Sequence, residues 1–453
     1  MIEHADYQLA LILPHSRQLL GMASLDTTEL PVVRIPLWER PAEQLTKQIE
    51  ARWKISTIVL DILFGPNSET PCAVAEVRTD CWDFENEGFC IVQPDIICDA
   101  SLVVSQSRSL KAILLGNDTS GSAFSRIGWI EDAQQWIQSS IHHHEVIFTG
   151  EVRQLNGGGA FCLLRLGTRF GPAYWIKGVG EPNDHEFAVT SFLAKHCPEY
   201  LPRIVAMRSD WNAWVMEEFG SSLHNSGSLD DFKRAVYRLA DLQKQLAGKS
   251  EELLAARCAD HRTEVLSSHI DEIIDYLDGA MVQQTSTKVP PLSTSRLHEI
   301  GVVLHHACLK LEELQIPDTL IHNDISPGSI LGNGTDCVFT DWCEAYVGNP
   351  FITFEQFCVH AARKTDEPEL WVRNLKSVYR SCWMGILTEH QIDGALQVSP
   401  LVAVLSYLYG RSDWLHTSKR REPAFLSYTR SLARHMDRIA AHIDLSETLC
   451  QPS

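Results

Sequence analysis

Short apolar runs alternate with turn residues along the first quarter of the chain, a pattern typical of strands joined by turns. The runs that predict strands lie at residues 7–13, 19–22, 57–63 and 73–77. Between them, Leu45, Ile49 and Trp53 recur every four residues, which predicts the apolar face of a helix. A polar stretch rich in glycine and serine at 116–122 marks the expected end of this region. Residues 1–122 are therefore predicted to form one small α+β domain.

The pattern changes twice in the rest of the chain. A helix is expected from Trp129 to Ile141 and another from about Asp184, with predicted strands between them at 146–155, 161–166 and 173–177. Long helices then take over, and the first has an apolar stripe at Phe232, Val236, Leu239, Leu242 and Leu246. Further helical pattern is found at 296–315 and through much of 354–445. The sequence thus predicts an α+β fold with a β-rich lobe at 123–220 and a helical lobe at 221–453.

Composition and charge narrow the class of protein. The 453 residues are 44% hydrophobic and 21% charged, which fits a globular protein of two or three domains. The 39 Lys and Arg residues against 58 Asp and Glu residues give a net charge of −19, whereas a dedicated nucleic-acid binder is expected to be basic. No run approaches the ~20 consecutive apolar residues that cross a bilayer. Neither a nucleic acid nor a membrane is therefore an expected partner.

Cysteine usage and the first residues bear on the compartment. The 13 cysteines are scattered without a Cys-x-x-Cys pair, whereas a disulfide framework or a zinc ribbon would show paired spacing. The segment Met1–Asp6 has neither the basic cap nor the apolar stretch of a secretion signal. We expect reduced, mostly buried thiols in a cytoplasmic protein.

The most informative stretch combines His322-Asn323-Asp324 with a second acidic residue, Asp341. An apolar lead-in precedes the His-x-Asp, a Pro-Gly turn follows it, and a later apolar strand ends in Asp-Trp. This spacing places two carboxylates at the ends of a β-hairpin. One carboxylate can accept a proton from an attacking hydroxyl, and the other can hold Mg²⁺ against nucleotide phosphates. Phosphoryl transfer asks mainly for positioning and charge neutralisation, so few residues suffice.

This segment resembles the catalytic hairpin of the aminoglycoside phosphotransferase and choline kinase-like family, which shares the protein-kinase fold. Members typically read His-Gly-Asp-x-x-x-x-Asn, followed by Ile-Asp-Trp or a close variant. The resemblance implies that Asp324 is the catalytic base, that His322 is its structural neighbour and that Asp341 binds Mg²⁺. It covers roughly residues 128–445 and implies a bilobal, protein-kinase-like fold with ATP, or GTP in its place, as the phosphate donor.

The same resemblance assigns roles to residues upstream, in the expected order. Gly157, Gly158 and Gly159 lie between two predicted strands and match the loop that covers the nucleotide. Glycine lets backbone N–H groups approach phosphate oxygens, although a plain hairpin turn would also explain this run. Lys177, at the end of a predicted strand, would pair with the phosphates. Glu186, nine residues later at a predicted helix start, would hold the lysine in place.

Two further positions complete the set. The stretch that ends the β-rich lobe resembles the hinge between lobes, where the backbone at Glu217 and Phe219 would contact adenine. The family has a metal-binding Asn five residues after the catalytic Asp, and this position is Ser329 here. A hydroxyl is a poorer Mg²⁺ ligand than an amide carbonyl, and Asn323 and Asn333 lie close in sequence as substitutes. The departure leaves a nucleotide-binding pseudokinase as an open alternative.

The N-terminal domain is similar in outline to a Nudix hydrolase, with strands before and after a helix. That family binds Mg²⁺ through glutamates on the helix. Aligned on Ile55, the acidic positions hold Gln48, Ala51 and Arg52, and only Glu50 nearby is acidic. The resemblance therefore implies a degenerate, non-catalytic domain that buttresses or regulates the rest of the chain.

The hypothesis that follows is an ATP-dependent phosphotransferase that moves the γ-phosphate to a hydroxyl of a small molecule. Aminoglycoside-like compounds, sugars and amino alcohols are the acceptor classes that the resemblance implies. The ordered series Lys177, Glu186, Asp324 and Asp341 carries this hypothesis. A Gly-x-x-x-x-Gly-Lys-Ser/Thr loop is missing from the sequence, which removes P-loop enzymes. The alternative is a pseudokinase with a regulatory or scaffolding role, and the change to Ser329 is its main support.

Overall fold

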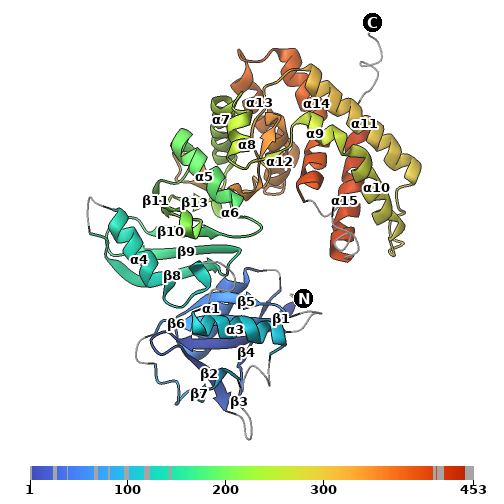
Figure 1. The fold of residues 1–453 in the computed structure, drawn as a ribbon. Helices are drawn as coiled ribbons and strands as arrows, with labels where there is room; N and C mark the ends of the chain where they lie inside the picture. Colours follow the sequence, from blue (N-terminus) through green and yellow to red (C-terminus); the bar gives the residue numbers. More distant parts are fainter. Residues whose placement is uncertain are drawn as a thin grey trace. The chain divides into compact units, whose positions relative to one another are not determined.

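The chain forms two compact units in a computed structural model. The described residues are 3–23, 28–37, 39–65, 70–79, 82–95, 102–116, 123–141, 145–411, 415 and 423–443. Unit 1 comprises Met1–Phe187 and Arg203–Glu218, and unit 2 comprises Ala188–Pro202 and Phe219–Ser453. Unit 1 is rich in strands and unit 2 in helices, so the predicted α+β class is confirmed (Figure 1).

Of the two expected domain boundaries, one lies close to a boundary between the units and the other adjoins residues outside the described part of the chain. The boundary at 122/123 adjoins residues 117–122, which lie outside the described part of the chain. The boundary at 220/221 lies two residues beyond the last passage from unit 1 to unit 2, which falls between Glu218 and Phe219. Unit 1 therefore holds both the expected N-terminal region and most of the expected β-rich lobe.

Unit 1 contains two sheets with helices packed on them. Its strands are β1 (His4–Leu13), β2 (Gln18–Ala23), β3 (Thr28–Glu29), β4 (Val32–Pro36), β5 (Thr57–Leu63), β6 (Cys72–Val77), β7 (Phe89–Val92), β8 (Phe148–Asn156), β9 (Phe161–Thr168), β10 (Tyr174–Val179), β11 (Ile204–Arg208) and β12 (Ala213–Glu217). Its helices are α1 (Pro41–Trp53), α3 (Val104–Leu115), α4 (Trp129–Ser140), the first residues of α5 (His185–His196), and the short turns η1 (Ala123–Ser125) and η3 (Ser209–Trp211).

The seven-stranded sheet is built around β1. Its order is β3-β2-β1-β6-β5, with β4 also paired to β1 and β7 to β2. Strand β1 runs parallel to β6 and antiparallel to β2 and β4. Leu9 and Leu11 pack with α1 on one face, and Ala10 and Ile12 pack with α3 on the other. Because both faces are covered, β1 is apolar at almost every central position, unlike a half-exposed strand.

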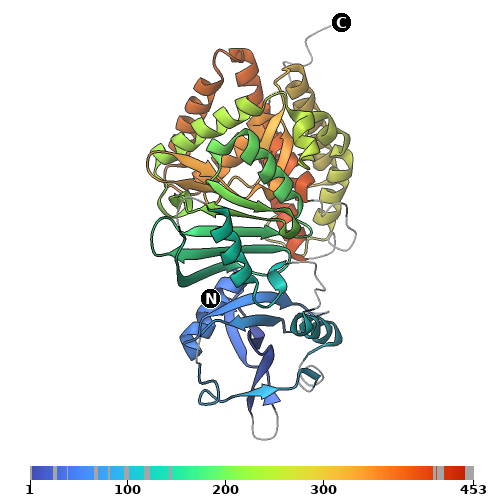
Figure 2. The ribbon, with the colours of Figure 1, turned by 60° about the vertical axis from the view of Figure 1, so that its left-hand side comes forward.

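The five-stranded antiparallel sheet, drawn in teal and green in Figure 2, has the order β11-β12-β10-β9-β8. One of its faces, which includes Leu164, Ile176 and Val215, belongs to the same hydrophobic core as Ala10 and Ile12 of the seven-stranded sheet. Helices α3 and α4 contribute to this core. The N-terminal sheet and the sheet that follows it are therefore packed as one body within unit 1.

The secondary-structure predictions for unit 1 are confirmed for the strands of the first hairpin, for α1 and for β8–β10. Helix α3 was not predicted from the sequence. Two of its buried positions are polar, Gln106 and Ser107, and they interrupt the apolar stripe. The Gln106 amide donates to the carbonyls of Leu63 and Thr70, at 3.0 and 3.1 Å. A buried polar side chain with such partners is stable but cannot be recognised from periodicity.

Unit 2 is a set of helices with two small three-stranded sheets. Its helices are the rest of α5, η2 (Pro198–Tyr200), α6 (Leu223–Ser226), α7 (Leu229–Leu246), α8 (Ser250–Ala255), α9 (Thr263–Ser268), α10 (Ile270–Val282), α11 (Thr294–Glu313), η4 (Trp342–Glu344), α12 (Pro350–Ala362), α13 (Pro368–Trp383), α14 (Glu389–Arg411) and α15 (Pro423–Ala440). The sheets have the orders β13-β16-β17 and β14-β18-β15, formed by β13 (Ser221–Ser222), β16 (Ile330–Gly332), β17 (Cys337–Phe339), β14 (Ala259–Asp260), β18 (Ala345–Gly348) and β15 (Thr319–His322).

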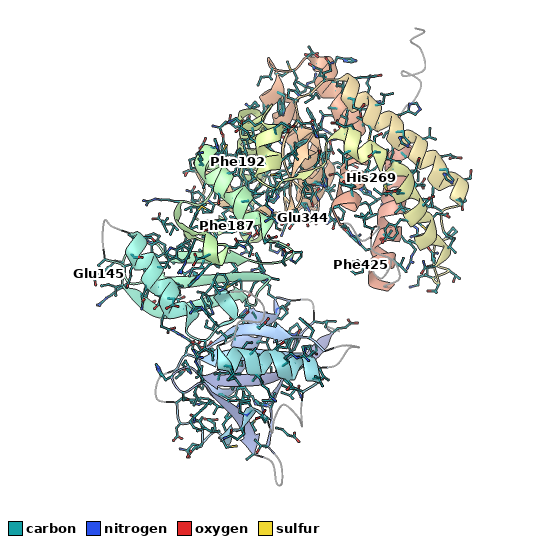
Figure 3. All side chains as sticks on the ribbon, viewed as in Figure 1. Glu145, Phe187, Phe192, His269, Glu344 and Phe425 are labelled. Carbon is teal, nitrogen blue, oxygen red and sulfur yellow. The ribbon has the colours of Figure 1, made fainter. Side chains whose placement is uncertain are left out.

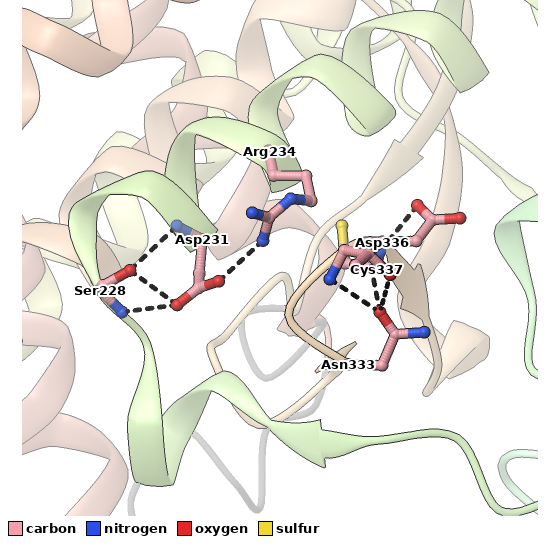
Figure 4. Close-up of polar contacts among 7 residues, drawn as sticks. Ser228, Asp231, Arg234, Asn333, Asp336 and Cys337 are labelled. Atoms are coloured by element: carbon pink, nitrogen blue, oxygen red, sulfur yellow. Dashed lines mark hydrogen bonds and ion pairs between the residues drawn. The ribbon is translucent and has the colours of Figure 1, made fainter.

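Helix α7 shows how the sequence pattern becomes structure. All five residues of its predicted apolar stripe are buried. Ser228 caps the helix: its hydroxyl accepts from the Asp231 N–H at 3.3 Å, and the Asp231 carboxylate accepts from the Ser228 N–H at 3.0 Å (Figure 4). Arg234 pairs with Asp231 at 2.7 Å. This reciprocal cap satisfies donors that a helix start otherwise leaves unpaired.

Helix α14 is long and apolar enough to span a membrane by composition, with a mean hydropathy of 1.3 over its best window. However, 67% of that window is buried inside the structure. Helices α11 and α12 pack against it, as expected of a core helix (Figure 1).

A buried histidine ties α14 to the sheet that leads into the candidate site. The His261 ring stacks on Tyr346 of β18 at 3.6 Å and meets Tyr409 edge-on at 4.9 Å. Its Nδ1 lies 2.8 Å from the Ser406 hydroxyl, and its backbone N–H donates to the Val347 carbonyl. Burial lowers the pKa of His261 to about 3, because a charged ring would lose its hydration here.

This pKa predicts a specific loss of stability in acid. A pKa below the ordinary 6.5 means that the stability is fully present above about pH 6.5 and is lost as the pH falls towards 3. From pH 7.5 to 5.5, His261 alone should lower the free energy of unfolding by about 1 kcal/mol. His261→Asn removes the titration, so urea unfolding of this variant should be less sensitive to this pH change. His15→Asn, in an exposed turn, is the matched control. Equal pH sensitivity of His261→Asn and the unsubstituted protein would contradict this account.

Candidate functional site

Unit 1 contains a buried ion pair on the face of the five-stranded sheet opposite the shared core. Lys177 of β10 and Glu186 of α5 are 1% and 0% exposed, and Lys177 Nζ lies 2.5 Å from Glu186 Oε1. The ammonium also lies 4.8 and 5.6 Å from the ring centroids of Phe161 and Trp214. Removing either member of such a pair leaves an uncompensated buried charge and costs about 3–5 kcal/mol. The structure thus brings together the two residues that the sequence pattern pairs.

Helix α5 begins in unit 1 and ends in unit 2. Phe187, the residue next to Glu186, contacts Trp214 in unit 1. Phe192, later in the same helix, stacks on His196 in unit 2 (Phe187 and Phe192 are labelled in Figure 3). Glu186 is therefore held by the strand-rich unit, in the first turn of a helix whose remaining residues belong to the helix-rich unit.

The loop Gly157–Gly159 joins β8 and β9. Steric contacts account for the glycine at position 157, and backbone conformation accounts for the glycine at position 158. A Cβ at Gly157 would lie 2.7 Å from the Val59 carbonyl oxygen, closer than real contacts allow. Gly158 has φ +110°, a conformation that side chains rarely adopt. The Gly159 carbonyl approaches Gly180 so closely that a Cβ on Gly180 would lie 2.3 Å from it. Close packing and backbone conformation therefore require glycine here, whatever the loop binds.

The predicted hinge positions lie on either side of the passage from unit 1 to unit 2. Glu217 ends β12, and its N–H donates to the Arg203 carbonyl at 2.9 Å. Its carboxylate accepts from the Arg203 guanidinium at 2.8 Å. Phe219 is half-buried and is the first residue of the second segment of unit 2.

In unit 2, His322 ties the end of β15 to two other segments. Its backbone N–H donates to the Thr353 hydroxyl at 3.0 Å, and Nε2 donates to the Thr340 carbonyl at 2.8 Å. A carbonyl only accepts, so Nε2 carries the proton. The ring lies 4.5 Å from that of Trp342, which is 2% exposed. His322 is therefore a structural support of the loop that carries Asp324.

Asp324 is exposed, whereas the residues on both sides of it, Asn323 and Ile325, are buried. The Asn323 amide donates to the Glu344 carboxylate at 3.0 Å, and its carbonyl oxygen accepts from Gln356 (Glu344 is labelled in Figure 3). The Asp324 backbone carbonyl accepts from the Ser326 N–H at 2.8 Å. An exposed residue thus lies on a loop whose flanks are fixed by burial and hydrogen bonds.

Ser329 is 2% exposed, and its hydroxyl donates to the carbonyls of Asp324 and Ser326, at 3.0 and 2.8 Å. Its carbonyl accepts from the N–H and the hydroxyl of Thr340, at 2.9 and 3.2 Å. The first role of Ser329 is therefore to hold the loop in shape. Asn333, the substitute considered from the sequence, accepts three hydrogen bonds within its own turn, from Thr335 and Asp336 (Figure 4).

Asp341 is separated from β17 by one residue, Thr340, and has φ +64° and ψ +59°, in the left-handed region. Few residues other than glycine adopt this region, and it costs about 1–2 kcal/mol for an L-residue, less for Asp and Asn. Trp342, the next residue, is buried. Backbone strain of this kind is often found at functional sites, where the surrounding structure maintains it.

Thr340 and Thr353 were missed by sequence reasoning, although they connect the loop to its surroundings. Thr340 lies between an apolar strand and an acidic residue, and Thr353 lies inside a largely apolar helix. A threonine in either setting usually fills space, so nothing in the sequence marks these two as hydrogen-bond partners of the loop.

Comparisons with solved structures find chains of similar arrangement at low identity. The macrolide 2′-phosphotransferase MphH of Brachybacterium faecium is 13% identical, with a TM-score of 0.45 over 67% of this chain and 98% of its own. The ethanolamine kinase of Plasmodium vivax is 13% identical, with a TM-score of 0.44 over 64% and 83%. A choline/ethanolamine kinase family protein of Mesorhizobium loti is 15% identical, with a TM-score of 0.44 over 69% and 98%. No protein-family model and no curated protein matches the sequence. Similarity at this level assigns neither a reaction nor a substrate.

The conformation of Asp341 predicts an unusual order of stability among variants. Asp341→Gly should have a higher free energy of unfolding than Asp341→Ala by about 1 kcal/mol, because glycine adopts positive φ without strain. Urea unfolding measures the difference. Lys54, at φ +58° after α1, offers a control pair, and Lys54→Gly should exceed Lys54→Ala in the same way. Equal stability of the two Asp341 variants would show that the residue relaxes to an ordinary conformation.

Proposed function

We propose that this protein is a kinase-like phosphotransferase that moves the γ-phosphate of ATP, or of GTP in its place, to a hydroxyl of a small molecule. The observation that carries the proposal is Asp324, an exposed residue on a loop whose flanking residues are buried and hydrogen-bonded. A catalytic base needs access to its substrate and a fixed position, and these two demands conflict on most surface loops. The loop around Asp324 meets both.

In this proposal, unit 1 supplies the cationic group for the phosphates. Lys177 keeps its charge in a buried site because Glu186 compensates it, at 2.5 Å. An ion pair of this kind is rarely the most stable way to fill a protein interior, since burying two charges costs several kcal/mol per ion. Its presence on a sheet strand is accounted for if the lysine contacts a phosphate during function, as in kinases.

Asp341 and Ser329 are the residues proposed to hold Mg²⁺. Asp341 offers carboxylate oxygens. The Ser329 hydroxyl has a single O–H, which it shares between the carbonyls of Asp324 and Ser326, so its lone pairs are left for another partner. Bound Mg²⁺ would neutralise phosphate charge. Among the described residues, no group of three or more His, Cys, Asp and Glu side chains could hold a metal ion. In nucleotide sites, Mg²⁺ often takes one or two protein ligands and completes its shell with phosphate oxygens and water.

In the proposed reaction, one proton is transferred to a side chain of this protein. Asp324 accepts the proton of the acceptor hydroxyl as that oxygen bonds to the γ-phosphorus. The bond from the γ-phosphorus to the bridging oxygen breaks, and ADP leaves with the electron pair. Lys177 holds the phosphates in place, and His322 keeps the loop of Asp324 in position through Thr340.

A second candidate is a pseudokinase that binds nucleotide without turnover and has a regulatory or scaffolding role. The specific observation in its favour is Ser329, because the resembled family has an amide at this position and the hydroxyl here is bonded to the loop itself. The two candidates differ in one measurable property, the transfer of the γ-phosphate.

The test uses ATP labelled in the γ-phosphate, Mg²⁺ and a panel of hydroxylated acceptors. The panel includes a macrolide, ethanolamine, choline, sugars and nucleosides, since the structural neighbours are named for some of these. We expect labelled product with at least one acceptor. Asp324→Asn keeps the shape but loses the base, so turnover should fall by about 10²–10⁴-fold. Its nucleotide affinity, measured by calorimetry, should stay close to that of the unsubstituted protein.

Asp366→Asn, an exposed residue between α12 and α13, is the matched control and should leave turnover unchanged. Full turnover by Asp324→Asn would refute its assignment as the base. Tight nucleotide binding without transfer to any acceptor, and without ATP hydrolysis, would favour the pseudokinase.

A further inference from the structure

The N-terminal sheet is joined to β8, the strand that precedes the glycine loop, by a pair of hydrogen bonds. Gln154, in β8, is 3% exposed. Its Oε1 accepts from the Val59 N–H at 2.8 Å, and its Nε2 donates to the Val59 carbonyl at 2.8 Å. Val59 lies in β5, 95 residues earlier in the sequence. One side-chain amide therefore pairs with both backbone groups of a residue in the other sheet of unit 1. This contact is called the Gln154 clamp below.

Both strands of the clamp are edge strands. Strand β5 ends the order of the seven-stranded sheet, and β8 ends that of the five-stranded sheet. The outward N–H and C=O groups of an edge strand need partners, and a buried pair without them costs several kcal/mol. Gln154 supplies both partners at Val59. Truncation of Gln154 would leave two buried backbone groups without them.

Each strand is also irregular at the clamp. The pairing of β5 with β6 shifts register between Val59 and Asp61, and that of β8 with β9 shifts between Gln154 and Asn156. Bulges bend a strand and redirect its neighbours, and they occur frequently next to functional sites. The chain thus departs from regular pairing on both sides of this one contact.

The glycine loop begins at Gly157, three residues after Gln154, and lies against the same atoms. A Cβ on Gly157 would lie 2.6 Å from Gln154 Nε2 and 2.7 Å from the Val59 carbonyl. A Cβ on Gly158 would lie 3.1 Å from a carboxylate oxygen of Asp61. Residues of the N-terminal sheet therefore pack directly against one side of the glycine loop.

An ion pair at the same junction is weaker than the clamp. Arg153 pairs with Glu43 of α1 at 3.0 Å, but the arginine side chain is 58% exposed. Exposed ion pairs contribute about 0–1 kcal/mol. The buried amide pair therefore fixes the position of β8 against β5 more firmly than this ion pair does.

We propose that Gln154 is a positioning residue for the nucleotide, because its clamp on Val59 makes the N-terminal sheet a structural part of the glycine loop. The inference rests on the proposed function, in which this loop covers ATP. A loop with three consecutive glycines has many accessible conformations, and ordering it upon binding would lower nucleotide affinity. The clamp orders the loop in advance, so the N-terminal sheet contributes to nucleotide affinity without contacting the nucleotide.

The test compares Gln154→Met with Gln138→Met in the full chain. Methionine keeps most of the side-chain volume but removes both hydrogen bonds of the clamp. Gln138, in α4 of the same unit, donates one hydrogen bond to the Val146 carbonyl at 3.3 Å and serves as the matched control. Calorimetry with ATP and Mg²⁺ should show affinity weaker by about tenfold in Gln154→Met, the loss of one to two net hydrogen bonds, and little change in Gln138→Met.

Hydrogen exchange of the backbone amides at 156–160 gives a second readout that needs no nucleotide. Exchange should be faster in Gln154→Met than in the unsubstituted protein, with exchange in β10 and α4 unchanged. Unchanged exchange in the loop would overturn the positioning role. Faster exchange with unchanged ATP affinity would overturn the link to the nucleotide. If the unsubstituted protein binds no nucleotide, the proposed function fails and the link fails with it, while the exchange data still decide whether the clamp orders the loop.

Discussion

The hydrogen bonds at Thr340 hold together the segments of unit 2 that carry the candidate chemistry. The Thr340 carbonyl accepts from His322 Nε2, and its N–H and hydroxyl both donate to the Ser329 carbonyl. Thr340 directly precedes Asp341, so three segments meet at one residue. Fixing each backbone residue costs about 1–2 kcal/mol of conformational entropy, and such a loop keeps one shape only if its contacts offset that cost. The position of Asp324 and the strained conformation of Asp341 both depend on this junction.

The candidate residues of unit 1 are held in position by burial, whereas those of unit 2 are held by a hydrogen-bonded loop. Lys177 and Glu186 are enclosed on one face of the five-stranded sheet, and the other face shares its core with the N-terminal sheet. A lysine removed from water is held rigidly, since its charge tolerates no position away from its partner. The N-terminal sheet is therefore part of the body that holds Lys177.

The sequence predicted those features that depend on local pattern or motif. The stripe of α7 follows the helical period, and the order of Lys177 and Glu186 follows a motif whose spacing matches a strand and the next helix. Features that depend on distant partners could not be predicted. Gln154 reads as an ordinary polar strand residue, because its partner, Val59, is 95 residues away. The roles of the candidate residues and the Nudix-like character of the N-terminal domain stay predictions.

The central claim is that this chain binds a nucleotide through magnesium, and calorimetric titration of ATP into the unsubstituted protein, with and without Mg²⁺, tests it most directly. The account predicts saturable binding that strengthens when Mg²⁺ is present, because the phosphates would then be held by the metal as well as by Lys177. Binding that is indifferent to Mg²⁺ would contradict the roles proposed for Asp341 and Ser329. The absence of binding by both ATP and GTP would contradict the claim itself.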